Sequence, residues 1–373
     1  MLVLSGIKPD IAHDGRRRWR RGARAVILAA ATVLVLASCS APLATESSVA
    51  AHTATASQSA KHVAATISVG KNPGPLAVSP DGTLYVTNYG DGTVSVIKGD
   101  RIITGISLSL GKVPGSMAVS PDGNVYLTNF DAGTVSVIKG DVVTSTINVG
   151  KTPELMVVSP DGTVYLTNYG DGTVSVIKGD RVTATISVGK NPAPLAVSPD
   201  GTVYVTNTGD GTVSVIKGDR VTATISVGKY PGPLAVSPDG TVYVTNLDDQ
   251  TVWVIKGDRV TAALTVGKNS GSMVVSPDGT VYVTNLDDGT VSVIKGDRVT
   301  ATLTVGKTPA SMAVSPDGTV YVTNLEDGTV SVIKGDRVIT TISVGKNPAP
   351  LAVAPDGTVY VTNTGAGTVS VLR

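Results

Sequence analysis

The sequence is poor in the residues that most often build reactive and metal sites. Its single cysteine, Cys39, excludes an internal disulfide framework and a cysteine-rich metal site. Its three histidines all precede the repeated part of the chain: His13, His52 and His62. Beyond Val63 the only glutamates are Glu154 and Glu326, and the G-x-S-x-G, H-E-x-x-H and phosphate-loop patterns are missing. We therefore expect no enzyme that depends on His, Cys or Glu chemistry.

Aromatic residues are also scarce. They make up 4% of the 373 residues, so aliphatic side chains have to form the core, and the abundant Val, Ile, Thr and Gly favour strands and turns over helices. Seven of the 30 Lys and Arg and two of the 29 Asp and Glu stand upstream of Cys39, which leaves 23 basic and 27 acidic residues from Cys39 onward. This acidic body lacks the basic footprint of a nucleic-acid partner.

The N-terminus has the pattern of an export signal. The basic segment Arg16–Arg24 precedes the apolar run Ala25–Leu36, whose length of about 12 residues is too short to span a bilayer. This order is typical of a signal peptide, here residues 1–38. The boundary Leu-Ala-Ser-Cys39 resembles the lipobox of bacterial lipoproteins, which implies that Cys39 is acylated; a plain signal peptide with an incidental cysteine is the alternative.

Residues 39–62 would then join the lipid to the rest of the chain. The segment is rich in Ser, Thr and Ala and has few large apolar residues, which is typical of a flexible tether. Two or more acyl chains give stable anchoring. We therefore expect an exported protein held by a lipid anchor at the outer face of the cell membrane.

Residues 63–373 repeat one unit eight times. The segment SPDGTVYVTN begins at Ser198, Ser237, Ser276 and Ser315, and near copies begin at Ser79, Ser120, Ser159 and Ala354. The spacing of the P-D-G aspartate is 41 residues once and then 39 residues six times, through Asp81, Asp122, Asp161, Asp200, Asp239, Asp278, Asp317 and Asp356. A period near 40 with four strands per unit predicts a propeller blade.

One unit illustrates the four strands, at residues 194–198, 202–207, 212–217 and 220–227. Tight turns rich in Gly, Pro and Asp separate them. The chain stops after a third strand, while Val63–Gly70 is a fourth strand without a unit of its own. We therefore predict an all-β, eight-bladed β-propeller of four-stranded antiparallel blades, closed by the N-terminal strand, which completes the last blade.

The motif Y-V-T-N, or Y-L-T-N, ends the second strand of every unit. Its tyrosines are Tyr85, Tyr126, Tyr165, Tyr204, Tyr243, Tyr282, Tyr321 and Tyr360. By these motifs the chain resembles the YVTN-repeat β-propeller family of exported and surface proteins of bacteria and archaea. The resemblance implies the propeller fold, for which seven blades are common in the family. The functions of the family are diverse and mostly unassigned, so the resemblance implies no single activity.

The turns and loops divide between two rims of the predicted ring. The SPDG and KGD turns share one rim, here the turn rim, and hardly differ among copies. The loop after Y-V-T-N and the connector G-K-x-P between blades share the other, here the loop rim, and do differ. Because binding residues usually lie on loops, we take the loop rim as the candidate binding surface.

Two sets of charges recur on the loop rim. In the loop after Y-V-T-N they are Asp91, Asp131, Asp171, Asp210, Asp249, Asp288 and Asp327, with Ala366 in the last copy. In the connectors they are Lys71, Lys112, Lys151, Lys190, Lys229, Lys268, Lys307 and Lys346. These residues suit either a polyvalent surface for a repetitive polar ligand or ordinary turn chemistry, since Asp before Gly favours turns.

A few aromatic residues interrupt the repeat. Tyr89 and Tyr230 lie in loop-rim positions, and Trp253 replaces the Ser of T-V-S-V-I-K. An exposed aromatic side chain can stack on a sugar or anchor a partner, whereas an isolated one more often serves packing. Paired aspartates such as Asp248 and Asp249 suit Ca²⁺, but the D-x-D-x-D-G calcium loop is missing.

Together these features favour a non-catalytic binding scaffold. Its expected partner is a protein or glycan of the cell envelope, and no cofactor is expected apart from Ca²⁺ as an alternative. We expect a monomer or weak self-association, because near-identical blades can also pair between chains. A calcium-dependent hydrolase or lyase and a structural surface-layer element remain the alternative functions.

Overall fold

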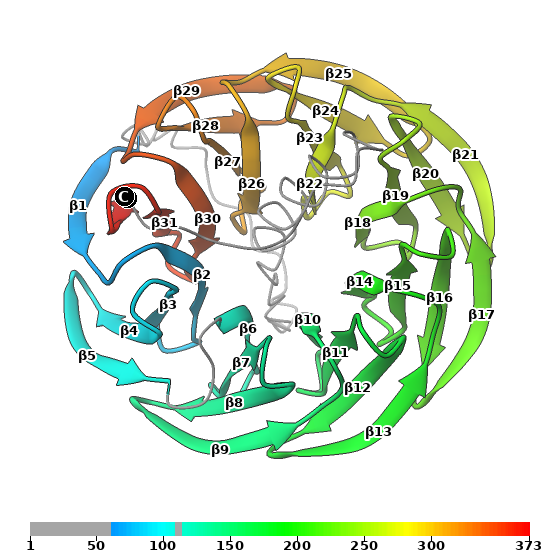
Figure 1. Cartoon of the computed structure of the whole chain (residues 1–373). Coiled ribbons are helices and arrows are strands. Elements are labelled where there is room, and N and C mark those ends of the chain that lie inside the picture. Colours follow the sequence, from blue (N-terminus) through cyan, green and yellow to red (C-terminus); the bar gives the residue numbers. More distant parts are fainter. Residues whose placement is uncertain (1–60, 109–113) are drawn as a thin grey trace, which may run out of the picture.

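The computed structural model describes residues 61–108 and 114–373, and these form a closed ring of eight four-stranded antiparallel sheets (Figure 1). The predicted eight-bladed propeller is confirmed. The predicted signal peptide, Cys39 and nearly all of the tether lie outside the described residues. No helix in the described part of the chain is long and apolar enough to cross a membrane.

The inner strands surround the axis of the ring (Figure 1). They are β2 (Pro73–Val78), β6 (Pro114–Val119), β10 (Pro153–Val158), β14 (Pro192–Val197), β18 (Pro231–Val236), β22 (Ser270–Val275), β26 (Pro309–Val314) and β30 (Pro348–Val353). Next outward are β3 (Leu84–Asn88), β7 (Val125–Asn129), β11 (Val164–Asn168), β15 (Val203–Asn207), β19 (Val242–Asn246), β23 (Val281–Asn285), β27 (Val320–Asn324) and β31 (Val359–Asn363). The inner strands begin about two residues earlier than their sequence pattern suggests.

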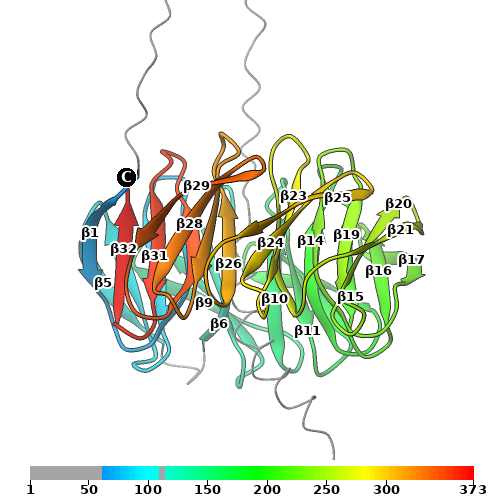
Figure 2. The same ribbon diagram turned by 90° about the horizontal axis from the view of Figure 1, so that it is seen from above.

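The third strands are β4 (Thr93–Lys98), β8 (Thr134–Lys139), β12 (Thr173–Lys178), β16 (Thr212–Lys217), β20 (Thr251–Lys256), β24 (Thr290–Lys295), β28 (Thr329–Lys334) and β32 (Thr368–Leu372). The outermost are β5 (Arg101–Ser107), β9 (Val142–Asn148), β13 (Arg181–Ser187), β17 (Arg220–Ser226), β21 (Arg259–Thr265), β25 (Arg298–Thr304), β29 (Arg337–Ser343) and β1 (Val63–Ser68). We number the blades from β2–β5 as blade 1 to β30–β32 with β1 as blade 8. The side view in Figure 2 places the two rims at opposite ends of the strands.

Each hydrophobic core lies between two blades rather than inside one. Tyr85 of blade 1 packs with Met117 and Leu127 of blade 2, and the other interfaces repeat this arrangement. The tyrosine also reaches across the interface, because the Tyr85 hydroxyl donates a hydrogen bond to the Gly140 carbonyl in the KGD turn of blade 2 at 2.9 Å. A single sheet therefore has no core of its own, and the blades stabilise one another in sequence.

The ring closes where the two ends of the described chain meet. Strand β1 pairs with β32, so that Ile67 lies opposite Val369 and joins the core between blades 8 and 1. Arg373 adds two hydrogen bonds to the carboxylate of Asp100 in blade 1, at 2.6 and 3.0 Å. The predicted completion of the last blade by the N-terminal strand is thus confirmed.

Ile67→Ala tests this closure. Ile67 is 7% exposed, and truncation of a buried aliphatic side chain costs about 2–4 kcal/mol. We expect thermal unfolding to shift down by roughly 4 °C or more. Ile103→Ala is the matched control, because Ile103 is 57% exposed on β5 and its truncation should leave the melt unchanged. Equal effects of the two substitutions would contradict closure by β1.

Candidate functional site

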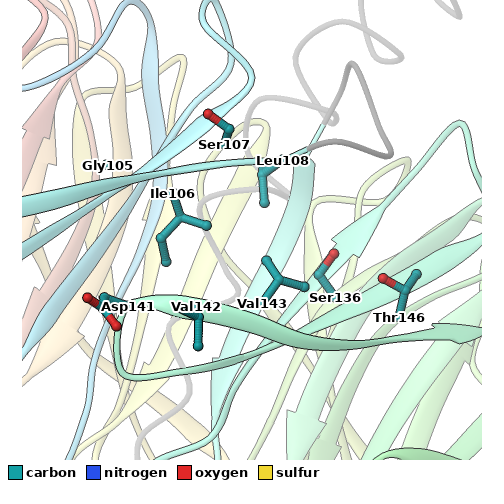
Figure 3. Close-up of a pocket in the computed structure, with 9 residues that line it drawn as sticks. All are labelled: Gly105, Ile106, Ser107, Leu108, Ser136, Asp141, Val142, Val143 and Thr146. Carbon is teal, nitrogen blue, oxygen red and sulfur yellow. The ribbon is translucent and has the colours of Figure 1, made fainter.

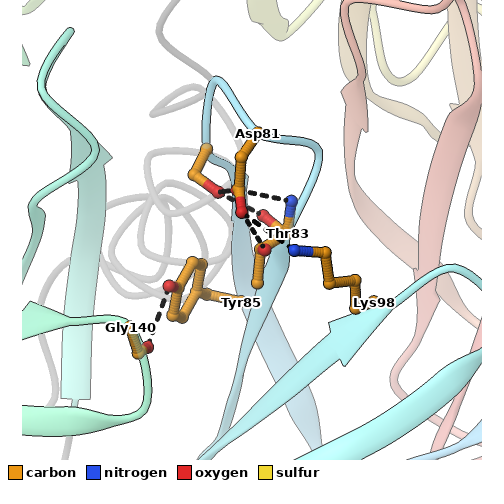
Figure 4. Close-up of polar contacts among 6 residues, drawn as sticks. Asp81, Thr83, Tyr85, Lys98 and Gly140 are labelled. Carbon is orange, nitrogen blue, oxygen red and sulfur yellow. Dashed lines mark hydrogen bonds and ion pairs between the residues drawn. The ribbon is translucent and has the colours of Figure 1, made fainter.

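The side chains of the turn rim are engaged in one repeated network (Figure 4). In blade 1 the Asp81 carboxylate accepts hydrogen bonds from the Ser79 hydroxyl at 2.6 Å and from the Thr83 backbone N–H at 3.1 Å. Lys98 lies 3.3 Å from the same carboxylate. The Ser–Asp bond recurs in the SPDG turn of every blade except blade 8, where Ala354 replaces the serine. These residues fix the turn, which explains why they do not vary.

In six of the eight SPDG-type turns these hydrogen bonds hold the pKa of the aspartate below its usual range. The bond from Ser79 is the largest cause of the lowered pKa of Asp81, followed by the bond from the Thr83 N–H. At Asp317 burial is the largest single effect and raises the pKa, but the hydrogen bonds from Ser315, Thr319 and Lys334 together outweigh it. The pKa is also lowered at Asp161, Asp200, Asp239 and Asp278. The ionised form of these carboxylates is therefore the one that the fold stabilises.

The loop-rim aspartates also serve the backbone. The Asp91 carboxylate accepts a hydrogen bond from the Lys71 backbone N–H at 2.7 Å, which ties the loop after Y-V-T-N to the connector that precedes the blade. We call this contact the Asp–Lys clasp. It recurs with Lys N–H to Asp distances of 2.6–2.8 Å at Lys151–Asp171, Lys190–Asp210, Lys268–Asp288 and Lys307–Asp327.

Several predicted charges of the loop rim have no described clasp. Asp131 stands one position earlier in its loop, and Ala132 occupies the place of the clasp aspartate. Asp249 of blade 5 accepts no hydrogen bond from Lys229. Lys112 lies outside the described residues. The lysine side chains of the described connectors, including Lys346, are exposed and form no ion pair with a described residue.

The asparagine of Y-V-T-N holds the connector beside the clasp through hydrogen bonds of its side chain. The sequence analysis did not predict this role. Asn88 is buried, and its side-chain amide donates to Thr93 Oγ1 and Ser95 Oγ at 3.0 and 2.9 Å. Its carbonyl oxygen accepts the Gly70 N–H at 3.1 Å. The identity of this residue in all eight copies was the available signal. The asparagine therefore joins two strands of one blade to the connector before it.

Tyr89 lies across the inner strand of blade 1 rather than pointing away from the rim. A Cβ at Gly74 would come within 2.0 Å of the Tyr89 ring, so glycine is needed there. The hydroxyl of Tyr89 is buried without a partner among the described residues, and burial raises its pKa well above the usual range. Leu247 covers Gly232 in blade 5 in the same way. Part of the sequence variation in the loop after Y-V-T-N therefore reflects how its first side chain packs against the inner strand.

A cavity of about 310 Å³ opens between the outer ends of blades 1 and 2 (Figure 3). Ile106 and Leu108 line one side, and Asp141, Val142 and Val143 line the other. Gly105 stands at the position that a threonine occupies in the outermost strands β13 and β17. A Cβ added to Gly105 would meet no other atom within 4 Å. The cavity therefore lies between β5 and the third and fourth strands of blade 2, and the lining residues include none of the predicted loop-rim charges.

No group of three or more His, Cys, Asp or Glu residues among the described residues is placed to hold a metal ion. No protein-family model and no curated protein sequence matches the chain.

Three solved propellers illustrate its structural similarities. Hydrazine synthase of Kuenenia stuttgartiensis is 23% identical, with 74% of this chain and 99% of that chain covered and a TM-score of 0.58. Virginiamycin B lyase of Staphylococcus aureus is 12% identical, with 84% and 99% covered and a TM-score of 0.58. The Dos1 propeller is 13% identical, with 84% and 95% covered and a TM-score of 0.65. At such identities the likeness shows the β-propeller fold alone.

The turn rim predicts a specific acid sensitivity. A folded-state pKa below the unfolded value gives stability that is present above the unfolded pKa and is lost as the pH falls through the folded pKa. We therefore expect the melting temperature to be flat from about pH 7 to 5 and to fall below about pH 4. Replacing Ser198, Ser237 and Ser276 by alanine should flatten this fall. An acid profile that these substitutions leave unchanged would show that the network does not govern it.

The Asp–Lys clasp predicts substitutions of opposite sign. Asp327→Ala removes a clasp and should lower the free energy of unfolding by about 0.5–1.5 kcal/mol. Ala366→Asp supplies the missing carboxylate opposite Lys346 and should raise it by a similar amount. Asp131→Ala, at an exposed position without a clasp, is the control and should change nothing. Denaturant unfolding of the three variants measures these effects, and a neutral Asp327→Ala would argue against the clasp.

Proposed function

We propose that the chain is a non-catalytic β-propeller, tethered by lipid to the outer face of the cell membrane, that binds an envelope protein or glycan through its loop rim. The export pattern before Cys39 supports the location. The acidic body makes nucleic acid a poor candidate partner.

The observation that carries this proposal is that one backbone feature is kept in every described connector while the side chain at that position differs. The residue before the inner strand has a positive φ between 49° and 56° in the seven described connectors, and its identity changes: Asn72, Thr152, Asn191, Tyr230, Asn269, Thr308 and Asn347. An exposed lysine precedes it each time. Four of these side chains, those of Asn72, Tyr230, Asn269 and Asn347, are exposed. Binding residues are usually placed on loops that a rigid scaffold holds in position.

Most aspartate carboxylates of the ring accept hydrogen bonds from the backbone or from neighbouring side chains. This structural use of the carboxylates supports binding over catalysis. Five loop-rim aspartates are held by backbone N–H groups, and the turn-rim aspartates accept hydrogen bonds within their own turns. One similar lyase structure is of a variant described as catalytically inactive after replacement of a histidine by alanine. The described residues of this chain contain only His62, at the start of the ring.

Affinity capture with rim variants tests the proposal. The bait is residues 40–373 and the source is a detergent-solubilised cell envelope. We expect the unchanged bait to capture a partner that is reduced about tenfold when Lys71, Lys190, Lys268 and Lys307 are changed to serine, since those side chains are exposed while their N–H groups maintain the clasps. Substitution of the aspartates would be less informative, because it also removes the clasps.

The matched control changes the same number of lysines on the opposite rim, namely Lys178, Lys217, Lys256 and Lys295. This bait should capture the partner at the level of the unchanged one. Equal capture by both variants would contradict binding through the loop rim, and capture lost only in the control would move the binding surface to the turn rim.

A further inference from the structure

We propose that blade 5 carries a saccharide-binding subsite on the loop rim, formed by Trp253 and Tyr230 with Asp249 and Gln250. This inference rests on the proposed function, because it assigns a ligand class to one part of the same rim. Blade 5 is singled out because several departures from the repeat coincide there. Two of them, Trp253 and the positive φ of the connector glycine Gly228, occur in no other described blade.

Trp253 is the first departure. The equivalent residue in the other seven blades is a serine such as Ser95, whose hydroxyl accepts a hydrogen bond from the buried asparagine. Trp253 has no such acceptor and instead donates from Nε1 to Thr251 Oγ1 at 3.1 Å. Its ring packs, partly buried, at the interface between blades 4 and 5, and its Cζ2 edge approaches Gly228.

The second departure is a rearranged connector. Having lost its serine partner, the side-chain amide of Asn246 donates to the Val227 carbonyl at 2.5 Å. In blade 1 the equivalent connector glycine donates its N–H to the asparagine, whereas Gly228 has φ of 84° and no such bond. The carbonyl oxygen of Asn246, a fully buried residue, is without a partner among the described residues, as are those of Asn129 and Asn324 in blades 2 and 7. An unpaired buried acceptor costs about 1–3 kcal/mol.

The rearrangement frees polar groups at the surface. The Asp249 carboxylate takes part in no clasp, and Gln250 has φ of 54° where the other loops have glycine. Both side chains are exposed, together with that of Asp248. Tyr230, 37% exposed, follows Lys229 in the connector that Trp253 approaches. Two aromatic rings, two carboxylates and one amide therefore belong to one rim segment.

This combination fits a sugar ring better than other ligand classes. Aromatic faces pack against the apolar C–H face of a pyranose. Carboxylate and amide side chains accept and donate hydrogen bonds to neighbouring hydroxyls. The acidic pair Asp248 and Asp249 disfavours phosphate and nucleic acid by charge repulsion. Departures that gather at one surface, in a chain of near-identical blades, are what a binding site that trades stability for function would show.

The sequence supplies a direct reporter for the test. The chain has two tryptophans, Trp19 and Trp253, so Trp253 is the only one in residues 40–373. Titration of this protein with N-acetylchitotriose, maltotriose and mannotriose should give a saturable change in tryptophan fluorescence with at least one of them, and glycerol should give none. No saturable change and no heat of binding with any of the trisaccharides up to about 10 mM would overturn the proposal.

Variants then locate the site. Tyr230→Ala and Gln250→Gly should each weaken the trisaccharide about tenfold, while Tyr89→Phe in blade 1 should leave its affinity unchanged. Trp253→Ser restores the repeat residue, so it should abolish binding by calorimetry while raising the melting temperature. Binding that survives Tyr230→Ala and Trp253→Ser would place the sugar elsewhere. Partner capture that depends on the rim lysines, without any trisaccharide binding, would refute the subsite and leave the proposed function standing.

Discussion

The burial of apolar side chains between blades is the constraint on which the rest of this structure depends. Tyr85, Val94 and Ile106 of blade 1 are buried in the core that blades 1 and 2 share. A four-stranded sheet of this kind cannot be stable alone, because its apolar side chains would be exposed. The ring must therefore close, and the chain closes it by adding β1 to β32. Near-identical blades follow from the same constraint, since every interface has to fit the next.

The polar side chains of the two rims stabilise different parts of the backbone. On the turn rim, aspartates bind the hydroxyl and N–H groups of their own turn, and these contacts hold the hairpins between strands. On the loop rim, Asn88 and the Asp91–Lys71 clasp hold the connector between blades and leave the lysine side chain exposed. The backbone of the loop rim is thereby fixed without using its outward side chains. Blades 2 and 8 have alanine in place of the clasp aspartate, whereas blade 5 keeps Asp249 but makes no clasp and also carries Trp253. This combination makes blade 5 the natural place to look for specificity.

The fold could be predicted from the sequence because its signals are local or periodic. The P-D-G spacing predicted the number of blades, and the unpaired strand before Gly70 predicted how the last blade is completed. Hydrogen-bond partners on the loop rim could not be predicted. Asp91 accepts a hydrogen bond from the Lys71 N–H, twenty positions earlier in the sequence. The two residues lie in different loops, and these loops come together only when the strands have packed into a blade. The offset of Asp131, by contrast, can be read from an alignment of the copies, which places Ala132 opposite Asp91. The effect of Trp253 on Asn246 and Gly228 left no trace in the pattern.

Amide hydrogen exchange in residues 40–373, resolved by residue, tests most directly the claim that clasps fix the loop rim and that blade 5 has lost its own. The backbone amides of the five clasped lysines, Lys71, Lys151, Lys190, Lys268 and Lys307, should exchange at least about tenfold more slowly than those of Lys229 and Lys346. Lys229 protected as well as the clasped lysines would contradict the account, because Asp249 would then be bound to its connector like the others.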